Sequence, residues 1–144
     1  MRALLLRLAR ANGGSAVVEL GLLAPLICAL LLGVLHVGIA MHDYNALRGI
    51  AADVARYTVV QYQTDNELSN AQLQSYARSV ATSPLYGLQD EDVQVTIANA
   101  GVQRVAGAKE LTLTVTYSID SLLTVIGMED FNISIERPIF VLDD

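Results

Sequence analysis

The amino-acid sequence predicts an α+β protein in which a long N-terminal helix and a second helix accompany a three-stranded antiparallel sheet. Two observations predict this architecture. A long uncharged apolar run is followed by an apolar stripe at helical spacing over about residues 44–61, whereas from residue 91 apolar and polar residues alternate with a period of two. A chain of 144 residues is long enough for one compact domain and an anchor.

The first helix contains an uncharged apolar run from Leu20 to Met41, 22 residues without Asp, Glu, Lys or Arg. As a helix this run spans roughly 33 Å, close to the hydrocarbon thickness of a bilayer. It predicts a transmembrane helix over residues 15–41. Three arginines and no acid precede residue 15, whereas residues 42–144 carry 14 acids and 6 bases. Because basic residues stay on the cytoplasmic side of an anchor, we expect the acidic part outside the cytoplasm.

The outer part, residues 42–144, is predicted to hold two helices and three strands. The first helix continues over about 44–61 with an apolar stripe, and Thr64-Asp65-Asn66-Glu67 is typical of a capping box that opens a second helix over about 66–83. Alternating residues predict strands at about 92–98, 110–119 and 130–137, each apolar on one face. Pro138 indicates that the last strand either lies at the sheet edge or ends there.

Residues that could carry chemistry are few, and we expect no catalytic, cofactor-binding or metal site. His36 and His42 are six residues apart, so they point to different sides of a helix and cannot share a metal. The single cysteine, Cys28, cannot form an intramolecular disulfide. Asp90-Glu91-Asp92 is interpreted as a solvated turn, because a calcium site needs more ligands from a shaped loop. The acidic outer part argues against nucleic acid as a partner.

The N-terminal segment allows several interpretations. A secretory signal is compatible with the small residues of Gly38-Ile39-Ala40, although its apolar core would be too long. A lipoprotein signal is disfavoured because Ile27, not a small residue, precedes Cys28. An uncleaved anchor fits the hydropathy but leaves Glu19 unexplained, since a carboxylate at the mouth of a membrane helix is disfavoured.

Cleavage after Gly14 would explain the residues Gly14, Ser15 and Glu19 together. A peptidase at the cytoplasmic face of the membrane would leave a free amino group on Ser15, which Glu19 would neutralise in a setting of low dielectric constant. Gly14 suits such a cut because glycine adopts backbone conformations open to few other residues. Gly14-Ser15 with Glu19 resembles the processing site of type IV prepilins, and the non-aromatic Ser15 makes it less similar to the type IVa and type II secretion kinds.

Two stretches are similar to TadE-like proteins of the tight-adherence (Flp, type IVb) pilus system. Glu19 to Ile27 resembles the start of those proteins and includes Pro25, which is either a harmless kink or a hinge in the membrane helix. Asn45 to Tyr57 is similar to the Ala-rich stretch that follows the membrane helix in the family. Leu20 stands where the main Flp pilin usually has Tyr or Phe, and together with the large outer domain it favours a minor pseudopilin.

The resemblance implies a function and a set of partners. Residues 1–14 would be a prepilin leader, and residues 42–144 a pilin-like periplasmic head on a single-pass helix in the bacterial inner membrane. The processed chain would help to assemble or initiate a Flp pilus used for adhesion, surface colonisation and biofilm. Expected partners are the prepilin peptidase, other pseudopilins, the Flp pilin, the inner-membrane platform and the lipid bilayer. The alternative is an uncleaved envelope protein whose outer domain binds a ligand or partner.

Overall fold

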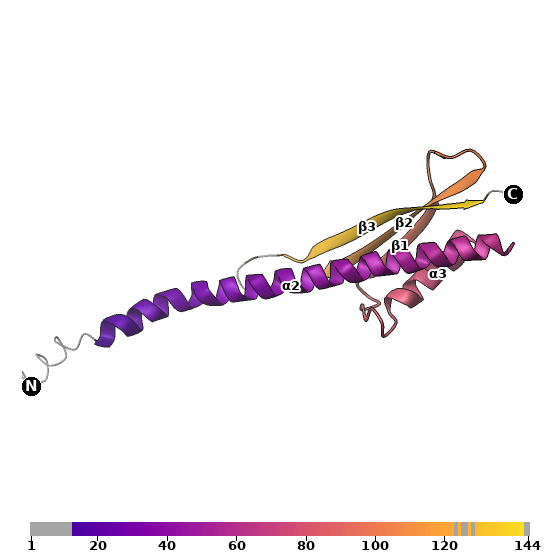
Figure 1. Ribbon diagram of the computed structural model, residues 1–144. Helices are drawn as coiled ribbons and strands as arrows, with labels where there is room; N and C mark the ends of the chain where they lie inside the picture. The colour runs from indigo at the N-terminus through magenta and orange to yellow at the C-terminus, as the bar shows by residue number, and fades with distance from the viewer. Residues whose placement is uncertain (1–12, 123, 125–126, 128, 143–144) are drawn as a thin grey trace, which may run out of the picture.

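The computed structural model describes residues 13–142 except 123, 125–126 and 128, and side chains from Val17 onward. A single helix, α2 (Gly13–Gln63), extends through 51 residues and forms one side of the molecule. A shorter helix, α3 (Asn70–Ala81), and the strands β1 (Val93–Asn99), β2 (Ala108–Ile119) and β3 (Phe131–Leu142) pack along its C-terminal half (Figure 1). The chain therefore has the predicted α+β architecture, with a long N-terminal helix, a second helix and a three-stranded antiparallel sheet.

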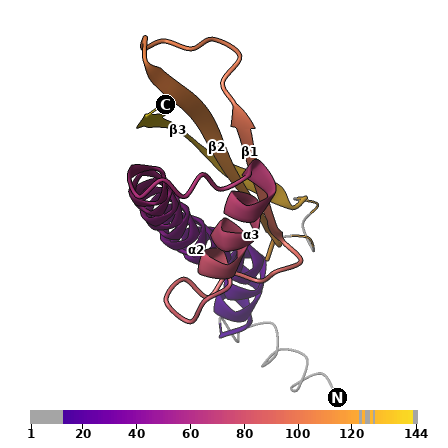
Figure 2. The ribbon, with the colours of Figure 1, turned by 90° about the vertical axis from the view of Figure 1, so that its right-hand side faces the viewer.

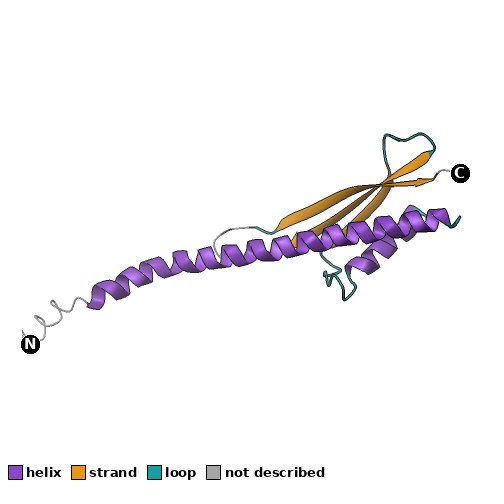
Figure 3. Ribbon diagram, in the orientation of Figure 1, coloured by secondary structure: helices purple, strands orange, loops and turns teal. Residues whose placement is uncertain are grey.

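The sheet is built in chain order, with β2 in the centre between β1 and β3. Both pairings are antiparallel, and Val115 of β2 lies opposite Val95 of β1 and Ile135 of β3. Both helices lie on the same face of this sheet, α2 against β2 and β3, and α3 against β1 (Figure 2). The other face is left without a covering element among the described residues, as Figure 3 also shows.

The core fills the space between the two helices and the covered face of the sheet. The alternation predicted for this strand is confirmed in β2. The odd-numbered residues from Leu111 to Ile119 are all buried, and the even-numbered residues between them are half-buried. From α2 and α3 the core receives side chains at helical spacing. These are Leu47, Ile50, Ala51, Val54, Ala55, Tyr62, Leu73, Ala77 and Ala81.

The second helix begins at Asn70, four residues later than predicted from the Thr64–Glu67 pattern. Thr64 belongs to the end of α2 instead, since its hydroxyl donates to the carbonyl of Gln61 at 2.9 Å. Asp65 has a φ of 55°, a left-handed conformation that stops a helix. The capping box that opens α3 is formed by Ser69 and Gln72.

β3 continues through Pro138 to Leu142, so of the two outcomes predicted for that proline the sheet-edge one is correct. Proline lacks an amide hydrogen, and an edge strand tolerates this because one side of its backbone needs no ladder partner. Arg137 lies opposite Leu113 and therefore occupies a position on the covered face of the sheet, where it remains exposed.

Candidate membrane anchor and assembly helix

The N-terminal half of α2 projects away from the sheet (Figure 1). Large apolar side chains are exposed all round this half of the helix. Leu22 is 76% exposed and Val34 is 75% exposed, values that a soluble protein reserves for isolated surface positions. The helix is long and apolar enough to cross a membrane. Such a continuous apolar surface requires a covering of lipid or of other apolar helices.

The predicted processing site lies in the first turns of α2. Gly14 and Ser15 belong to the helix, which begins at Gly13, whereas residues 1–12 of the predicted leader lie outside the described residues. Glu19 follows one turn after Ser15, with its side chain exposed and in neither of the ion pairs formed by described residues. Positions four residues apart lie on the same helix face about 6 Å apart along the axis.

Pro25 lies inside α2, and the helix runs through it without a break. Its missing amide hydrogen leaves the carbonyl of Gly21 without the usual helical hydrogen bond, and its ring crowds that carbonyl. Gly21 has open space around it, with no atom within 4 Å of a Cβ placed there. The side chains of Pro25 and of Cys28 are both exposed.

His36 marks the point where the head first covers α2. Its side chain is only 6% exposed, and the ring of Phe131 at the start of β3 meets it edge-on at a centroid distance of 5.2 Å. Among the described residues neither of its ring nitrogens has a hydrogen-bond partner. His42 is exposed on a different side of the helix, as the six-residue spacing predicted. No local pattern predicts the contact between His36 and Phe131, because these residues are far apart in the chain.

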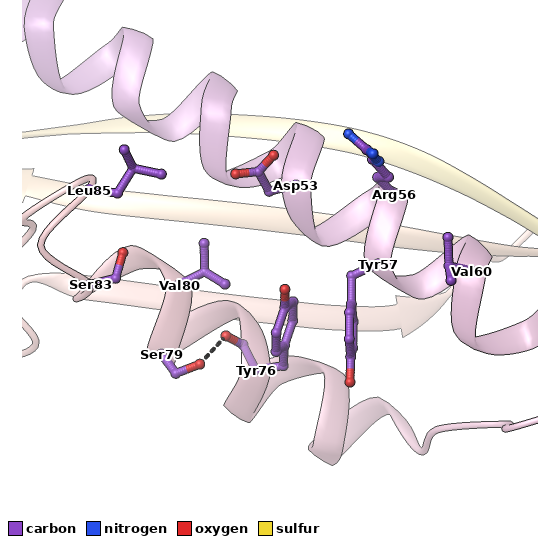
Figure 4. Close-up of a pocket in the computed structure, with 9 residues that line it drawn as sticks. All are labelled: Asp53, Arg56, Tyr57, Val60, Tyr76, Ser79, Val80, Ser83 and Leu85. Atoms are coloured by element: carbon purple, nitrogen blue, oxygen red, sulfur yellow. Dashed lines mark hydrogen bonds between the residues drawn. The ribbon is translucent and has the colours of Figure 1, made fainter.

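A groove between α2 and α3 is a second feature that the sequence analysis missed (Figure 4). The rings of Tyr57 and Tyr76 stack at one end of it with a centroid distance of 3.7 Å and an interplanar angle of 18°. Next to the groove, the hydroxyl of Tyr86 donates to Asp53 at 2.7 Å. Burial is the larger cause and this hydrogen bond to a carboxylate the second cause of a pKa raised to about 12 for Tyr86, so the phenol keeps its proton and acts as a donor.

Gly49 is required for the position of Tyr86. A Cβ on Gly49 would lie 2.7 Å from Cε1 of the Tyr86 ring, so any larger residue would push the ring away from α2. The groove therefore depends on a close approach of the loop after α3 to the long helix. Its lining combines apolar side chains with hydroxyls, Asp53 and Arg56, an arrangement that suits contact with a peptide or another protein surface.

The described residues contain no group of three or more His, Cys, Asp or Glu side chains that could hold a metal ion. The carboxylates of Asp90 and Glu110 instead pair with arginines of the head, Arg78 and Arg104 respectively. Hydrogen bonds from these guanidinium groups lower the pKa of both carboxyl groups. These pairs tie loops to the body of the head.

Comparison with known proteins finds a similarity in the N-terminal part of the chain. No curated protein and no solved structure matches the chain. Residues 14–56 match the family model described as TadE-like protein, which covers the exposed half of α2 and the first core-forming turns that follow it. The matched segment begins at Gly14 and includes Glu19 and Pro25. Over residues 14–56, 43 of its 144 residues, the chain is therefore similar to TadE-like proteins.

Proposed function

We propose that this chain is a minor pseudopilin of a Flp/Tad-type pilus, processed by a prepilin peptidase and retained in the bacterial inner membrane by α2. Residues 1–14 are the leader, residues 15–41 cross the membrane with the N-terminus in the cytoplasm, and the head formed by residues 42–144 is periplasmic. The observation that carries the proposal is the exposed apolar half of α2, which is uncharged from Leu20 to Met41 and has one carboxylate, Glu19, directly before that run. The TadE-like match over the same segment supports it.

The mechanism begins with the peptide bond between Gly14 and Ser15. Hydrolysis there produces a new amino group at the start of a helix that is otherwise apolar for more than twenty residues. In a medium of low dielectric constant an isolated ammonium group is costly, and a carboxylate within reach offsets that cost. Glu19 of the same chain lies one turn away, and Glu19 of a neighbouring chain is equally able to pair with it when helices assemble side by side.

Assembly follows from the two halves of the molecule. The exposed half of α2 packs beside the apolar helices of the Flp pilin and of other pseudopilins at the inner-membrane platform, and Pro25 supplies a hinge there. The head is too large for a slender shaft and remains outside the membrane as part of an initiating complex. The chain contributes no catalysis of its own, in keeping with the structural character of the pilus-associated family.

The decisive experiment determines the N-terminus of the full chain recovered from membranes of cells with and without an active prepilin peptidase. We expect a start at Ser15 only when the peptidase is active, and a start at Met1 for a Gly14→Leu variant. Gly21→Leu is the matched control, because Gly21 is a glycine of the same helix with open space around it. A start at Met1 in every strain would overturn the proposal, and a start at Met41 would indicate an ordinary secreted domain.

The carboxylate is tested separately by pilus assembly. Glu19→Ala and the neutral isostere Glu19→Gln both remove the charge that would pair with the new amino group, so both are expected to reduce surface pili. Glu67, an exposed acid of the head, provides the control in Glu67→Gln. Normal pilus numbers in both Glu19 variants would remove the role assigned to this carboxylate.

The groove between α2 and α3 favours a second candidate function, an uncleaved envelope protein whose outer domain binds a ligand or partner. Its stacked tyrosines and mixed lining provide a recognition surface that simple anchoring does not require. If the chain starts at Met1 in every strain and normal numbers of surface pili form without it, this alternative would be supported.

A further inference from the structure

The head covers part of the apolar run that was predicted to lie in the membrane. His36 is buried beneath Phe131, and Ala40 packs against the core. Figure 1 shows the start of β3 alongside the middle of α2. The uncharged run continues to Met41, so its last six residues lie beside the head instead of below it.

The helix before and after His36 has lengths that suit two zones of a bilayer. The uncharged part from Leu20 to Leu35 contains 16 residues and spans roughly 24 Å, and with Val17 and Val18 on the other side of Glu19 the stretch reaches roughly 28 Å, close to a hydrocarbon core of about 30 Å with Glu19 at its cytoplasmic boundary. The stretch from His36 to Met41 adds roughly 9 Å, comparable to the headgroup zone of one leaflet, since a bilayer with both headgroup zones measures about 40–45 Å. The part of the head that contacts His36 is therefore at headgroup depth.

The residues at this end of the head suit that depth. Leu122 is 43% exposed and Phe131 is 38% exposed, and a hydrogen bond of 2.7 Å from the amide of Ser121 to Asp130 holds their neighbours together. On α2, Val37 and Met41 are 59% and 62% exposed. Apolar side chains beside charged groups are typical of segments that lie in the membrane interface.

Charged and aromatic residues near Phe131 limit how deeply this part of the head can lie in the bilayer. Asp120, Glu129 and Asp130 are exposed beside the apolar side chains, and carboxylates do not enter the hydrocarbon core without a large cost in free energy. One turn beyond Met41, the half-exposed ring of Tyr44 has the guanidinium of Arg48 5.9 Å from its centroid. Tyrosine is favoured at the boundary between membrane and water, which agrees with headgroup depth for the turn before it.

We propose that the membrane-proximal edge of the head, defined as Leu122, Phe131, Val37 and Met41, is embedded in the headgroup region of the outer leaflet. The lipid surface is the partner of this edge, and the head rests on the membrane instead of standing clear of it. This inference rests on the membrane anchoring in the proposed function. It extends that function, because a head docked on lipid has to leave the lipid surface when the helix is extracted for assembly.

The absence of tryptophan from the chain allows a direct depth measurement. Single-tryptophan variants of the full chain are reconstituted in phosphatidylcholine vesicles that contain brominated acyl chains, which quench tryptophan on contact. We expect about a twofold loss of emission for Phe131→Trp, whose ring would lie roughly 5–10 Å into the headgroup and acyl boundary. Leu122→Trp is the second reporter and leaves the contact between His36 and Phe131 intact.

Two further variants make the result decisive. Phe140→Trp is the matched control, because Phe140 is 41% exposed on the same strand but about 30 Å further along it, and we expect acrylamide in the water, not lipid, to quench it. Leu30→Trp reports on the anchor itself. If lipid quenches Leu30→Trp strongly while Phe131→Trp and Leu122→Trp behave like Phe140→Trp, the docking of the head on lipid is wrong but the membrane anchoring stands. An unquenched Leu30→Trp would overturn the membrane anchoring as well.

Discussion

Replacement of His36 by leucine is expected to stabilise the head on the long helix. The ring is 6% exposed, and neither ring nitrogen has a hydrogen-bond partner among the described residues. A buried polar group without a partner costs about 1–3 kcal/mol, whereas leucine has a similar volume and no polar atom to desolvate. The edge-on contact with Phe131 contributes about 0.5–1.5 kcal/mol in the opposite direction. The balance is a gain of about 1 kcal/mol in the free energy of unfolding.

Thermal unfolding of the full chain in detergent micelles measures this gain. All six tyrosines lie between residues 44 and 117, so near-ultraviolet circular dichroism follows the head alone. For a domain of this size, about 1 kcal/mol corresponds to a rise in Tm of roughly 4–8 °C. His42→Leu is the control, because His42 is exposed and its replacement should leave Tm unchanged. A lower Tm for His36→Leu than for the unmodified chain would refute the reasoning, since it would mean that the imidazole nitrogens are satisfied.

Three further changes test the packing, the capping and the electrostatics of the head. Leu113→Ala in the central strand, where the side chain is 0% exposed, should lower the free energy of urea unfolding by about 2–5 kcal/mol, and a loss below 1 kcal/mol would contradict the assigned core. Ser69→Ala removes the hydroxyl that accepts from the amide of Gln72 and should cost about 1 kcal/mol in the same assay, whereas Ser69→Asp should retain the cap. The Arg104 guanidinium lowers the pKa of Glu110, so in acid the unfolded chain binds a proton more readily than the folded one. The stability that the Arg104–Glu110 pair contributes is complete above the ordinary pKa of 4.5 and is lost as the pH falls through the lower pKa of the folded state. Tm measured over a series of pH values should therefore fall in this range for the unmodified chain. The fall in Tm should be smaller for Glu110→Gln.

The residues of β2 explain why the sheet could be predicted from the sequence. β3 pairs with β2 along its whole length and β1 pairs with residues 111–117. One face of β2 is covered by helices while the other is open, so strict alternation is the only pattern that buries the apolar side chains. β3 carries a similar alternation, yet Ile133 and Ile135 are only half-buried and Phe131 is exposed. Alternation identifies the face of a strand but does not state how far a helix extends over that face.

The start of α3 could not be predicted because the sequence offers two capping signals five residues apart. Thr64 with Glu67 and Ser69 with Gln72 both have the spacing of a capping box. The choice between them depends on where α2 ends. α2 continues to Gln63 and uses the hydroxyl of Thr64 at its own C-terminus, so only Ser69 remains to open the next helix. This is a competition between neighbouring elements that no local pattern contains.

The candidate processing site could be proposed from the sequence because its pattern is local, and it stays a prediction. Gly14, Ser15 and Glu19 lie within two turns of helix, inside the segment 14–56 that is similar to TadE-like proteins. The groove between α2 and α3 requires Tyr57 and Tyr76, which belong to different helices and meet only after folding. Hydropathy predicts the end of the membrane segment at Met41 from apolar composition alone, and it contains no information on the contact that buries His36.

The position of His36 connects the anchor with the head. A titratable ring within an uncharged membrane segment is costly in hydrocarbon, but the cost falls where a protein surface covers the ring. Phe131 provides that cover at the level where the hydrocarbon core would end, so the polar residue coincides with the first contact of the head instead of lying at random in the run. The segment from His36 to Met41 then has to satisfy both lipid and protein, which accounts for its being apolar while only part of it is buried. If the segment belonged to the membrane core alone, a chain with His36→Leu would insert more favourably but its head would gain no stability, and the Tm measurement separates these two cases.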